Sequence, residues 1–369
     1  MDNNPTLLNY DETKSKYSCT ITDINVSFIN SLRRTIISDI PTFVFKTFPH
    51  NESNVTIHKN NGRLNNEIIK QRISCIPVYI KDHSIDYNNF EFIINKTNDQ
   101  DEIIYVTTND FQVKNTLTNK FLPKNEVQKI FPADSITGDY IIISRLRPKM
   151  GDTIPGETLH LTGKISLETA KTDGAFNVSH TCFYRNSVNP IKQNEEWSKY
   201  EKTLTSLTSD ERELEKKNWY LHEGLRFFKN NTFDFELESI GVFKNKELLK
   251  MACNILIERS KNTLKNIQNN KNLITKWDTT LKNGYDIKLE NEDYTIGKVF
   301  EYIFHEKYYK NEKKLNFVGF RKNHPHDDYS IIRFGFNEDT QEGVIYDMFY
   351  DATQLAVSYY ENLRELFAV

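Results

Sequence analysis

The sequence predicts an α+β fold made of two modules, with a small β-rich domain inserted into the first. Strand-like alternation and helix-like spacing follow one another over residues 1–81 and again over 157–270. Between them, residues 82–156 carry only short strand-like runs separated by Asn, Asp, Lys, Pro and Gly. After a polar connector at 269–276, residues 277–369 form a second self-contained run of strands and helices.

The length and net charge of the chain limit the classes of function that it can have. A chain of 369 residues corresponds to about two to three domains. Its formal net charge of −3 gives no overall basic field that would draw the chain to nucleic acid. If the protein serves a nucleic-acid machine, we therefore expect it to do so through other proteins.

The cysteines and the hydrophobic runs exclude further classes. Cys19, Cys75, Cys182 and Cys253 are scattered without a C-x-x-C pair, so we expect buried, reduced thiols and no structural zinc site. The polar, acidic N-terminus does not resemble a signal peptide, and no apolar run reaches the roughly 20 residues that span a bilayer. The sequence therefore predicts no membrane association.

The first helix is predicted from Asp23 to Pro41, with Asn25 as its N-cap. An apolar stripe recurs at helical spacing through Val26, Ile29, Leu32, Ile36, Ile37 and Ile40. Asn30, Ser31, Thr35 and Ser38 are assigned to the remaining polar surface, and Arg33 and Arg34 flank the stripe. The simplest interpretation is an amphipathic helix on a sheet, with both arginines in solvent.

The other elements of the first module follow in order. We expect a strand over 13–24, a strand pair near Phe43 and Val55, a helix from Leu64 to Ser74, and a strand from Ile76 to Ile80. The inserted domain contributes strands at 90–94, 103–107 and 141–146, and the module resumes with 157–167, 233–238 and a long helix to about 269. The charged segment 190–222 is interpreted as a solvated helical excursion or a mobile insertion, without chemistry.

The second module is predicted to open with a strand over 285–289 and a helix capped by Thr295. Strands at 316–321 and 329–336 follow, joined by a turn at 323–326. The last helix, from about Thr340 to Leu366, carries apolar residues close to a three-four repeat. Such a seam is suited to packing against another helix.

Two motifs in the first module resemble a known family. The first helix reads S-L-R-R-T-I-I-S-D-I-P and the second closes in R-I-S-C-I-P, which matches at Leu32, Arg33, Arg34, Ile40, Pro41, Arg72, Ile76 and Pro77. This pattern resembles the assembly subunit of multisubunit RNA polymerases: bacterial alpha, archaeal D and the third-largest subunit of RNA polymerase II. The strand F-D-F-E-L-E-S-I-G, which leads into a long helix, resembles the closing unit of the same fold.

The second module resembles the small partner of that subunit, the archaeal L subunit or the eleventh subunit of RNA polymerase II. Its helix start matches at Asp293, Thr295, Ile296 and Gly297, with Lys298 in place of Asn. Its turn matches at Phe317, Gly319, Phe320, His324 and Pro325. The two partners are separate chains in cells, and the fused arrangement is similar to that in RNA polymerases of large DNA viruses.

The resemblance implies two alpha-subunit-like modules that form an intramolecular pseudo-dimer. Its module–module interface would comprise Val26, Ile29, Leu32, Ile36, Ile296, Val299, Phe300, Ile303, Phe304, Leu355 and Tyr359. Docking to the large subunits would fall to Arg33, Arg34 and Arg72, because the arginine fork suits acidic surfaces.

The resemblance also implies a non-catalytic role without cofactor or metal. The expected partners are the two largest polymerase subunits and a small zinc-bearing subunit, with little or no direct DNA contact. The expected location is the cytoplasmic factory and virion of a virus, or the nucleus of a cell. The cysteine-ligated metal of some cellular relatives is not expected, because residues 82–156 contain no cysteine.

Two other functions remain open from the residues alone. His324, His326, Asp327 and Asp328 could serve a free-standing metal-dependent hydrolase, although a turn beside a strand with solvated carboxylates explains them as well. The terminal helix could instead build a structural homo-oligomer. No nucleophile elbow, P-loop or dinucleotide-binding glycine motif is present to indicate another enzyme.

Overall fold

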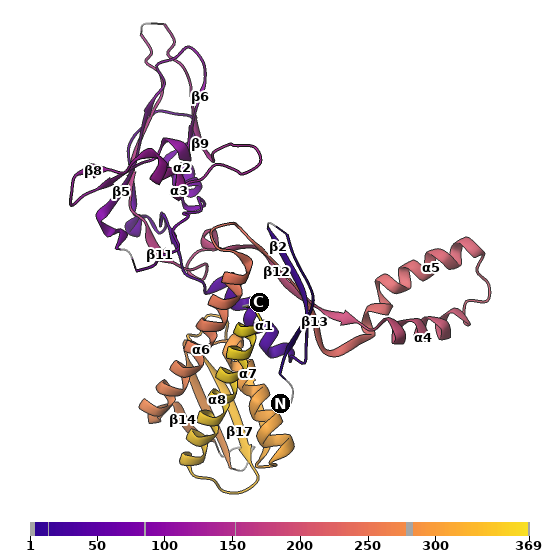
Figure 1. Cartoon of the computed structure of the whole chain (residues 1–369). Coiled ribbons are helices and arrows are strands. Elements are labelled where there is room, and N and C mark those ends of the chain that lie inside the picture. The colour runs from indigo at the N-terminus through magenta and orange to yellow at the C-terminus, as the bar shows by residue number, and fades with distance from the viewer. Residues whose placement is uncertain (1–3, 14, 85, 152, 278–282, 368–369) are drawn as a thin grey trace. The chain divides into compact units, whose positions relative to one another are not determined.

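A computed structural model describes residues 4–13, 15–84, 86–151, 153–277 and 283–367. The chain divides into two compact units (Figure 1). The larger unit comprises residues 1–36, 179–238 and 245–369, and the smaller unit comprises 37–178 and 239–244. The predicted C-terminal module lies entirely in the larger unit, and its residues 278–282 lie outside the described part of the chain.

The first sheet of the larger unit has the order β1-β2-β13-β12. It is formed by β1 (Thr6–Glu12), β2 (Lys16–Thr22), β13 (Phe228–Ser239) and β12 (Ser179–Val188). The predicted alternation in the second strand is confirmed, since Tyr17, Cys19 and Ile21 are buried. Strand β1 was not predicted, because its side chains are nearly all exposed and its sequence lacks an apolar alternation.

The second sheet of the larger unit has the order β14-β15-β17-β16, and every pair is antiparallel. Its strands are β14 (Ile274–Trp277), β15 (Gly284–Glu290), β17 (Tyr329–Phe336) and β16 (Leu315–Arg321). Helix α7 (Tyr294–Phe304) lies on this sheet, with the rings of Phe304 and Phe334 4.8 Å apart. Part of the predicted polar connector 269–276 is thus the edge strand β14.

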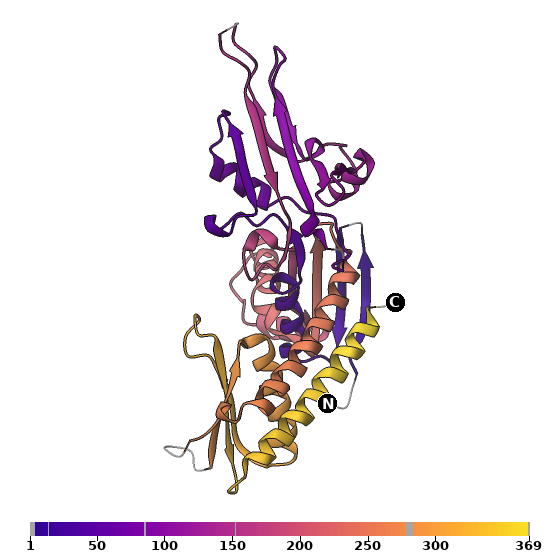
Figure 2. The same cartoon turned by 90° about the vertical axis from the view of Figure 1, so that its left-hand side faces the viewer.

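Two helices of 25 residues each, α6 (Asn245–Asn269) and α8 (Glu342–Leu366), lie side by side (Figures 1 and 2). Each buries an apolar stripe along its length, as the helical spacing in the sequence predicts. Helix α1 (Val26–Ser38) has its buried face toward this group, and α7 continues as a π-helical segment, His305–Asn311. None of the described helices is long and apolar enough to cross a membrane.

The smaller unit is built on a five-stranded antiparallel sheet of order β4-β10-β5-β7-β8. Its elements are β4 (Val55–Asn60), β10 (Thr158–Gly163), β5 (Phe90–Thr97), β7 (Gln112–Asn115), β8 (Lys120–Phe121), α2 (Asn66–Ser74) and α3 (Lys124–Ile130). Two further strand pairs are β3 (Thr42–Val44) with β11 (Ser166–Glu168), and β6 (Ile104–Thr107) with β9 (Ile142–Leu146). The compact unit therefore extends beyond the predicted insertion 82–156, because strands before and after that range share its sheet.

The charged segment 190–222 forms a hairpin of helices α4 (Pro190–Glu201) and α5 (Ser209–Leu221), which joins β12 to β13 (Figure 1). Its interior is aromatic: Trp197 and Trp219 are buried, with ring centroids 5.5 Å apart. The two helices agree with the helical alternative of the sequence prediction, whereas this aromatic core was not anticipated.

Several local predictions need correction. Ser31 and Thr35 are buried on α1 and do not face solvent. The N-cap of α7 is Asp293, whose carboxylate accepts from the backbone N–H of Thr295, and Thr295 itself lies in the first turn. Helix α1 ends at Ser38, α2 begins at Asn66 after the N-cap Asn65, and α8 begins at Glu342.

Short 3₁₀ segments complete the described structure. They span His50–Glu52, Tyr87–Asn89, Thr108–Asp110, Gly174–Phe176, Glu223–Arg226 and Lys271–Leu273.

Candidate functional site

The ring of Phe28 on α1 lies at a junction between segments from opposite ends of the sequence. Its centroid is 4.1 Å from that of Tyr359 and 5.4 Å from that of Tyr360, both on α8. It also meets the edge of Tyr302 on α7 at 6.1 Å. Phe28 is fully buried. These rings therefore fill the junction of α1, α7 and α8 with apolar surface, which stabilises it by burial and by edge-to-face contact.

Hydrogen bonds from side-chain hydroxyl groups fix the orientation of the helices at this aromatic junction. Ser31 Oγ donates to the carbonyl of Phe28 at 2.7 Å and lies 2.7 Å from the hydroxyl of Tyr360. Since the serine proton is used on Phe28, Tyr360 is the donor of the second bond. Burial raises the pKa of Tyr360, which keeps this donor protonated. The hydroxyl of Tyr359 donates to the carbonyl of Asp23 at 2.8 Å.

Arg34 joins α1 to the start of α7. Its Nη2 donates to Oδ2 of Asp293 at 2.9 Å, and its Nε donates to Oγ1 of Thr295 at 2.9 Å. The side chains of Arg34 and Asp293 are 33% and 26% exposed, so the pair is partly withdrawn from water. Asp293 therefore has two roles, since it also caps α7 through the N–H of Thr295.

A second arginine completes the charge network. Arg259 of α6 binds Glu292 with Nη2 at 2.5 Å from Oε2, and its Nη2 lies 3.8 Å from Oδ1 of Asp293. Burial alone would raise the pKa of Asp293, but hydrogen bonds from Thr295 and the charges of Arg34 and Arg259 outweigh it. Together they lower the pKa of Asp293 to about 2. The carboxylate is therefore charged throughout the physiological range.

The other two predicted docking arginines lie elsewhere. Arg33 donates from Nε and Nη2 to Oδ1 of Asn30, at 3.1 and 3.0 Å, and stays on the surface of its own helix. The thiol of Cys182 donates to the backbone carbonyl of Arg33 at 3.9 Å. Arg72 lies in the smaller unit, is exposed, and donates to the carbonyl of Ile143 at 3.1 Å. The three arginines thus differ: Arg34 has partners near the other end of the sequence, the side chain of Arg33 bonds, among the described residues, only to its own helix, and Arg72 bonds from α2 to β9 within the smaller unit.

The predicted interface residues fall into three groups. Buried side chains are Ile29, Leu32, Ile36, Ile296, Val299, Phe300, Ile303 and Phe304. Leu355 and Tyr359 are half-buried, whereas Val26 is 47% exposed. Phe300 and Phe304 contact Phe349 of α8 at 5.7 and 4.8 Å, so the stripe of α7 packs within the C-terminal segment itself. Tyr302 and Thr295 of α7 contact Phe28 and Arg34 of α1, respectively, and the N-cap Asp293 also binds Arg34.

A scan against protein-family models matches residues 19–260 to the RNA polymerase Rpb3/Rpb11 dimerisation domain. The match runs from β2 through α1 and the smaller unit to the middle of α6. The chain belongs to this family. A search among curated proteins finds no match.

Membership makes the chain an alpha-like, assembly-type subunit of a DNA-directed RNA polymerase. Domains of this family heterodimerise and assemble with the large polymerase subunits, and they are non-catalytic. The family match ends before the C-terminal segment, so the contacts of α1 with α7 and α8 join matched to unmatched residues.

Sequence reasoning missed Phe28, Tyr302, Tyr360 and the acceptor Glu292. It named Asp293 only as part of the helix-start motif and did not foresee that Asp293 accepts from Arg34. Phe28 lies three and seven positions before Ser31 and Thr35, and all three are buried. If serine and threonine had been allowed on the buried face of the helix, the helical spacing would have included Phe28, Ser31 and Thr35. The acceptors carried a weaker signal, namely two adjacent carboxylates immediately before a helix, which is a common N-terminal pattern.

The cluster His324–Asp328 is an ordinary turn in this structure. The backbone N–H of His324 donates to Oδ2 of Asp327 at 3.0 Å, and the N–H of His326 donates to Nδ1 of His324 at 3.2 Å. Within the described residues no group of three or more His, Cys, Asp and Glu side chains could hold a metal ion. No observation here favours the hydrolase hypothesis.

Proposed function

We propose that this chain is a fused assembly platform, in which an N-terminal and a C-terminal dimerisation module pair within one polypeptide. The family establishes the assembly-type role, and the fusion is our inference from the arrangement of the larger unit. There the two ends of the sequence share one compact unit.

One observation supports this proposal most directly. Phe28 contacts Tyr302, Tyr359 and Tyr360, and Arg34 binds Asp293, so residues of the first helix meet residues 293–360 near the other end of the sequence. In a family whose domains heterodimerise, such contacts correspond to those between two partner chains. A tether raises the effective concentration of the second module to about the millimolar range, so association needs no encounter between chains.

Cleavage of the connector tests the pairing. We would insert a flexible protease site after Asn270, between α6 and β14, cut the folded protein, and measure the size of the product. The proposal predicts that both fragments co-elute as one species under native conditions and separate only in denaturant. Separation of the native fragments at micromolar concentration would refute it, because an interface of standard size holds at that concentration.

We further propose that the platform captures the two large polymerase subunits, with Arg33 and Arg72 among the docking residues. Within the part of the chain that the structure describes, the side chain of Arg33 bonds only to its own helix, and that of Arg72 makes a single bond to the carbonyl of Ile143, so their removal leaves the apolar core contacts in place. The double variant Arg33→Ala, Arg72→Ala is expected to fold normally and to lose most of its co-purification with a large subunit. Undiminished capture by the folded variant would contradict this assignment.

A small zinc-bearing subunit is proposed as a third partner, and viral transcription as the setting. Both rest on the resemblance of the fused arrangement to polymerases of large DNA viruses. In that setting the protein is expected in the cytoplasmic factory and the virion, and in a cell it is expected in the nucleus. Mass spectrometry of complexes purified through the tagged chain tests the partner, and immunolocalisation tests the setting.

A further inference from the structure

The five-stranded sheet of the smaller unit has two chemically different faces. Side chains such as Phe92, Ile94 and Val113 point into the apolar core. The intervening residues point the other way: Gln112 pairs with Ile93, and Lys114 pairs with Phe121, so these side chains share the opposite face. We call this opposite surface the open face.

Polar and aromatic groups follow one another across the open face. On β10, His160 lies opposite Asn95 of β5, and its ring is 4.7 Å from that of His58 on β4. At the far edge, Phe121 is 54% exposed, and the ammonium of Lys114 lies 6.0 Å from its ring centroid. An exposed aromatic ring with a cation beside it is a surface on which a flat ligand can stack.

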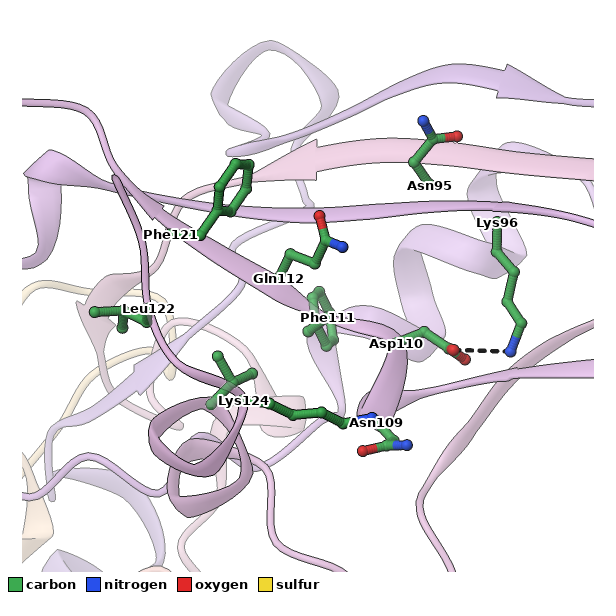
Figure 3. Close-up of a pocket in the computed structure, with 10 residues that line it drawn as sticks. Asn95, Lys96, Asn109, Asp110, Phe111, Gln112, Phe121, Leu122 and Lys124 are labelled. Carbon is green, nitrogen blue, oxygen red and sulfur yellow. Dashed lines mark hydrogen bonds and ion pairs between the residues drawn. The ribbon is translucent and has the colours of Figure 1, made fainter. Parts of the chain in front are cut away.

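A pocket of about 490 Å³ lies beside this ring and is lined by amides (Figure 3). Asn95, Gln112 and Asn109 contribute to its walls. The carbonyl oxygen of Asn109 accepts from Gln128 at 3.2 Å, which leaves its NH₂ group free to donate. Amide side chains supply both donors and acceptors, which suits the edges of nucleobases.

The charge around the pocket is positive. Its one lining carboxylate, Asp110, is bound by Lys96 at 2.7 Å and by the N–H of Thr107 at 2.8 Å (Figure 3). Lys114 and Lys124 form no ion pair with a described residue, although Glu91 lies opposite Lys114 in the sheet. Lys120 pairs with Asn115, so its side chain lies on the other face of the sheet. Unpaired lysines near an aromatic ring are available to phosphate groups.

We propose that the open face binds single-stranded nucleic acid. A base stacks on Phe121, its edge bonds to the amides of the pocket, and the neighbouring phosphates contact Lys114 beside the ring and Lys124 at the pocket. A protein partner fits less well, because lysine is depleted from protein interfaces and the only large exposed apolar side chain among the pocket-lining residues is Phe121. The inference does not depend on the fused platform.

Fluorescence anisotropy with the full chain tests this proposal. The probes are labelled oligo-dT and oligo-U of about 12 nucleotides, and a duplex of the same length. We expect the single strands to bind more tightly than the duplex, and Phe121→Ala to weaken binding roughly 10-fold while Phe121→Trp retains it. Replacing Lys114 and Lys124 by glutamine should reduce the salt dependence, with the log–log slope falling by about 1.4.

Matched controls keep the test specific. Phe228→Ala removes another exposed ring, and Lys192→Gln with Lys216→Gln removes the same charge from the larger unit. Both controls should bind as the parent does. The proposal is overturned if no single strand binds, if the duplex binds equally well, or if a control loses as much affinity as its matched variant. Loss of protein capture by Phe121→Ala without oligonucleotide binding would assign the face to a protein partner instead.

Discussion

The two compact units reach stability in different ways. The smaller unit is almost continuous in sequence, and its core is a stack of rings: Phe111 lies 4.6 Å from Phe131 and 5.6 Å from Phe45. The larger unit is assembled from three separate segments of the sequence. Its junction joins residues more than 250 positions apart and combines rings with directed polar bonds, such as Arg34 to Asp293.

The two cores differ in how strongly they must select one packing arrangement over others. In the smaller unit, rings from segments close in sequence fill the core, and few other side chains compete for the same positions. A helix that must find partners at the other end of the chain has many apolar surfaces to choose from. Buried polar bonds that are satisfied in only one arrangement can select among them, and we infer this role for Ser31, Arg34 and Arg259.

The largest effect is expected from removing the ring at the junction. Phe28→Ala should lower the free energy of unfolding by about 3–5 kcal/mol, because a fully buried ring leaves a cavity between three helices. Hydrogen exchange measured by mass spectrometry should rise in α1, α7 and α8 while the smaller unit stays protected.

Phe92→Ala is the matched variant in the smaller unit, where Phe92 is also fully buried. It should raise exchange in the five-stranded sheet and leave α8 protected. If either substitution loosens both units equally, the two units do not behave as separate cores and the comparison fails.

A smaller effect is expected at the helix that follows Asp293. A Cβ atom on Gly297 would lie 2.0 Å from Cε2 of Phe320, so Gly297→Ala must displace α7 from β16. We expect a loss of about 1–3 kcal/mol, as for an overpacked core, measured by urea unfolding.

Gly343→Ala is the control, because a Cβ there meets nothing within 4 Å and the residue lies in the first turn of α8. It should be neutral or stabilising by up to about 1 kcal/mol. The double variant Gly297→Ala, Phe320→Ala should relieve the clash. If Gly297→Ala alone is as stable as the parent, the close approach of α7 to β16 is not a constraint.

Removing the ion pair between Arg34 and Asp293 should lower the free energy of unfolding by a similar or smaller amount, and this loss depends on pH. The pKa of Asp293 is about 2 in the fold and near 4 in an unfolded chain, so its ionisation stabilises the fold by about 2 kcal/mol. Because the folded pKa is the lower one, this contribution is complete above about pH 4 and is lost as the pH falls toward 2. Arg34→Ala should cost about 1–2 kcal/mol at pH 7 and flatten the acid dependence in this window. If the free energy of unfolding of Arg34→Ala depends on acidic pH as the parent's does, Arg34 does not lower the pKa of Asp293.

The smallest effect is expected at the neighbouring arginine. Arg33→Ala removes only bonds to Asn30 on the same helix, so its free energy of unfolding should stay within about 0.5 kcal/mol of the parent. Thermal unfolding of the two single variants side by side checks this. A destabilisation as large as that of Arg34→Ala would remove the distinction between the core arginine and the surface arginine.

The sequence predicted most of the elements because their periodicities are strong. The alternation of Tyr17, Cys19 and Ile21 and the stripe of α7 both lie where they were expected. The motif around Leu32, Arg33 and Arg34 led to the family that the model match establishes. Periodicity failed where a strand has no buried face, as in β1.

The polar contacts of the junction could not be predicted in the same way. Serine and threonine on a helix are usually assigned to solvent, and only the partner 329 positions away, Tyr360, explains why Ser31 is buried. The two arginines of the motif are adjacent in sequence, yet the helical rotation of about 100° between them gives one a partner on α7 and the other only Asn30. Tertiary neighbours, which a pattern does not contain, decide such cases.

The separation of Ser31 from its partner has a consequence for biosynthesis. At roughly 5–20 residues per second, a ribosome needs on the order of tens of seconds to make the 329 residues between them. During that time the smaller unit can complete its sheet, but the apolar face of α1 remains exposed to solvent until α8 has been synthesised. A nascent chain with this topology is expected to need a chaperone, and to aggregate when translation is truncated before Tyr360.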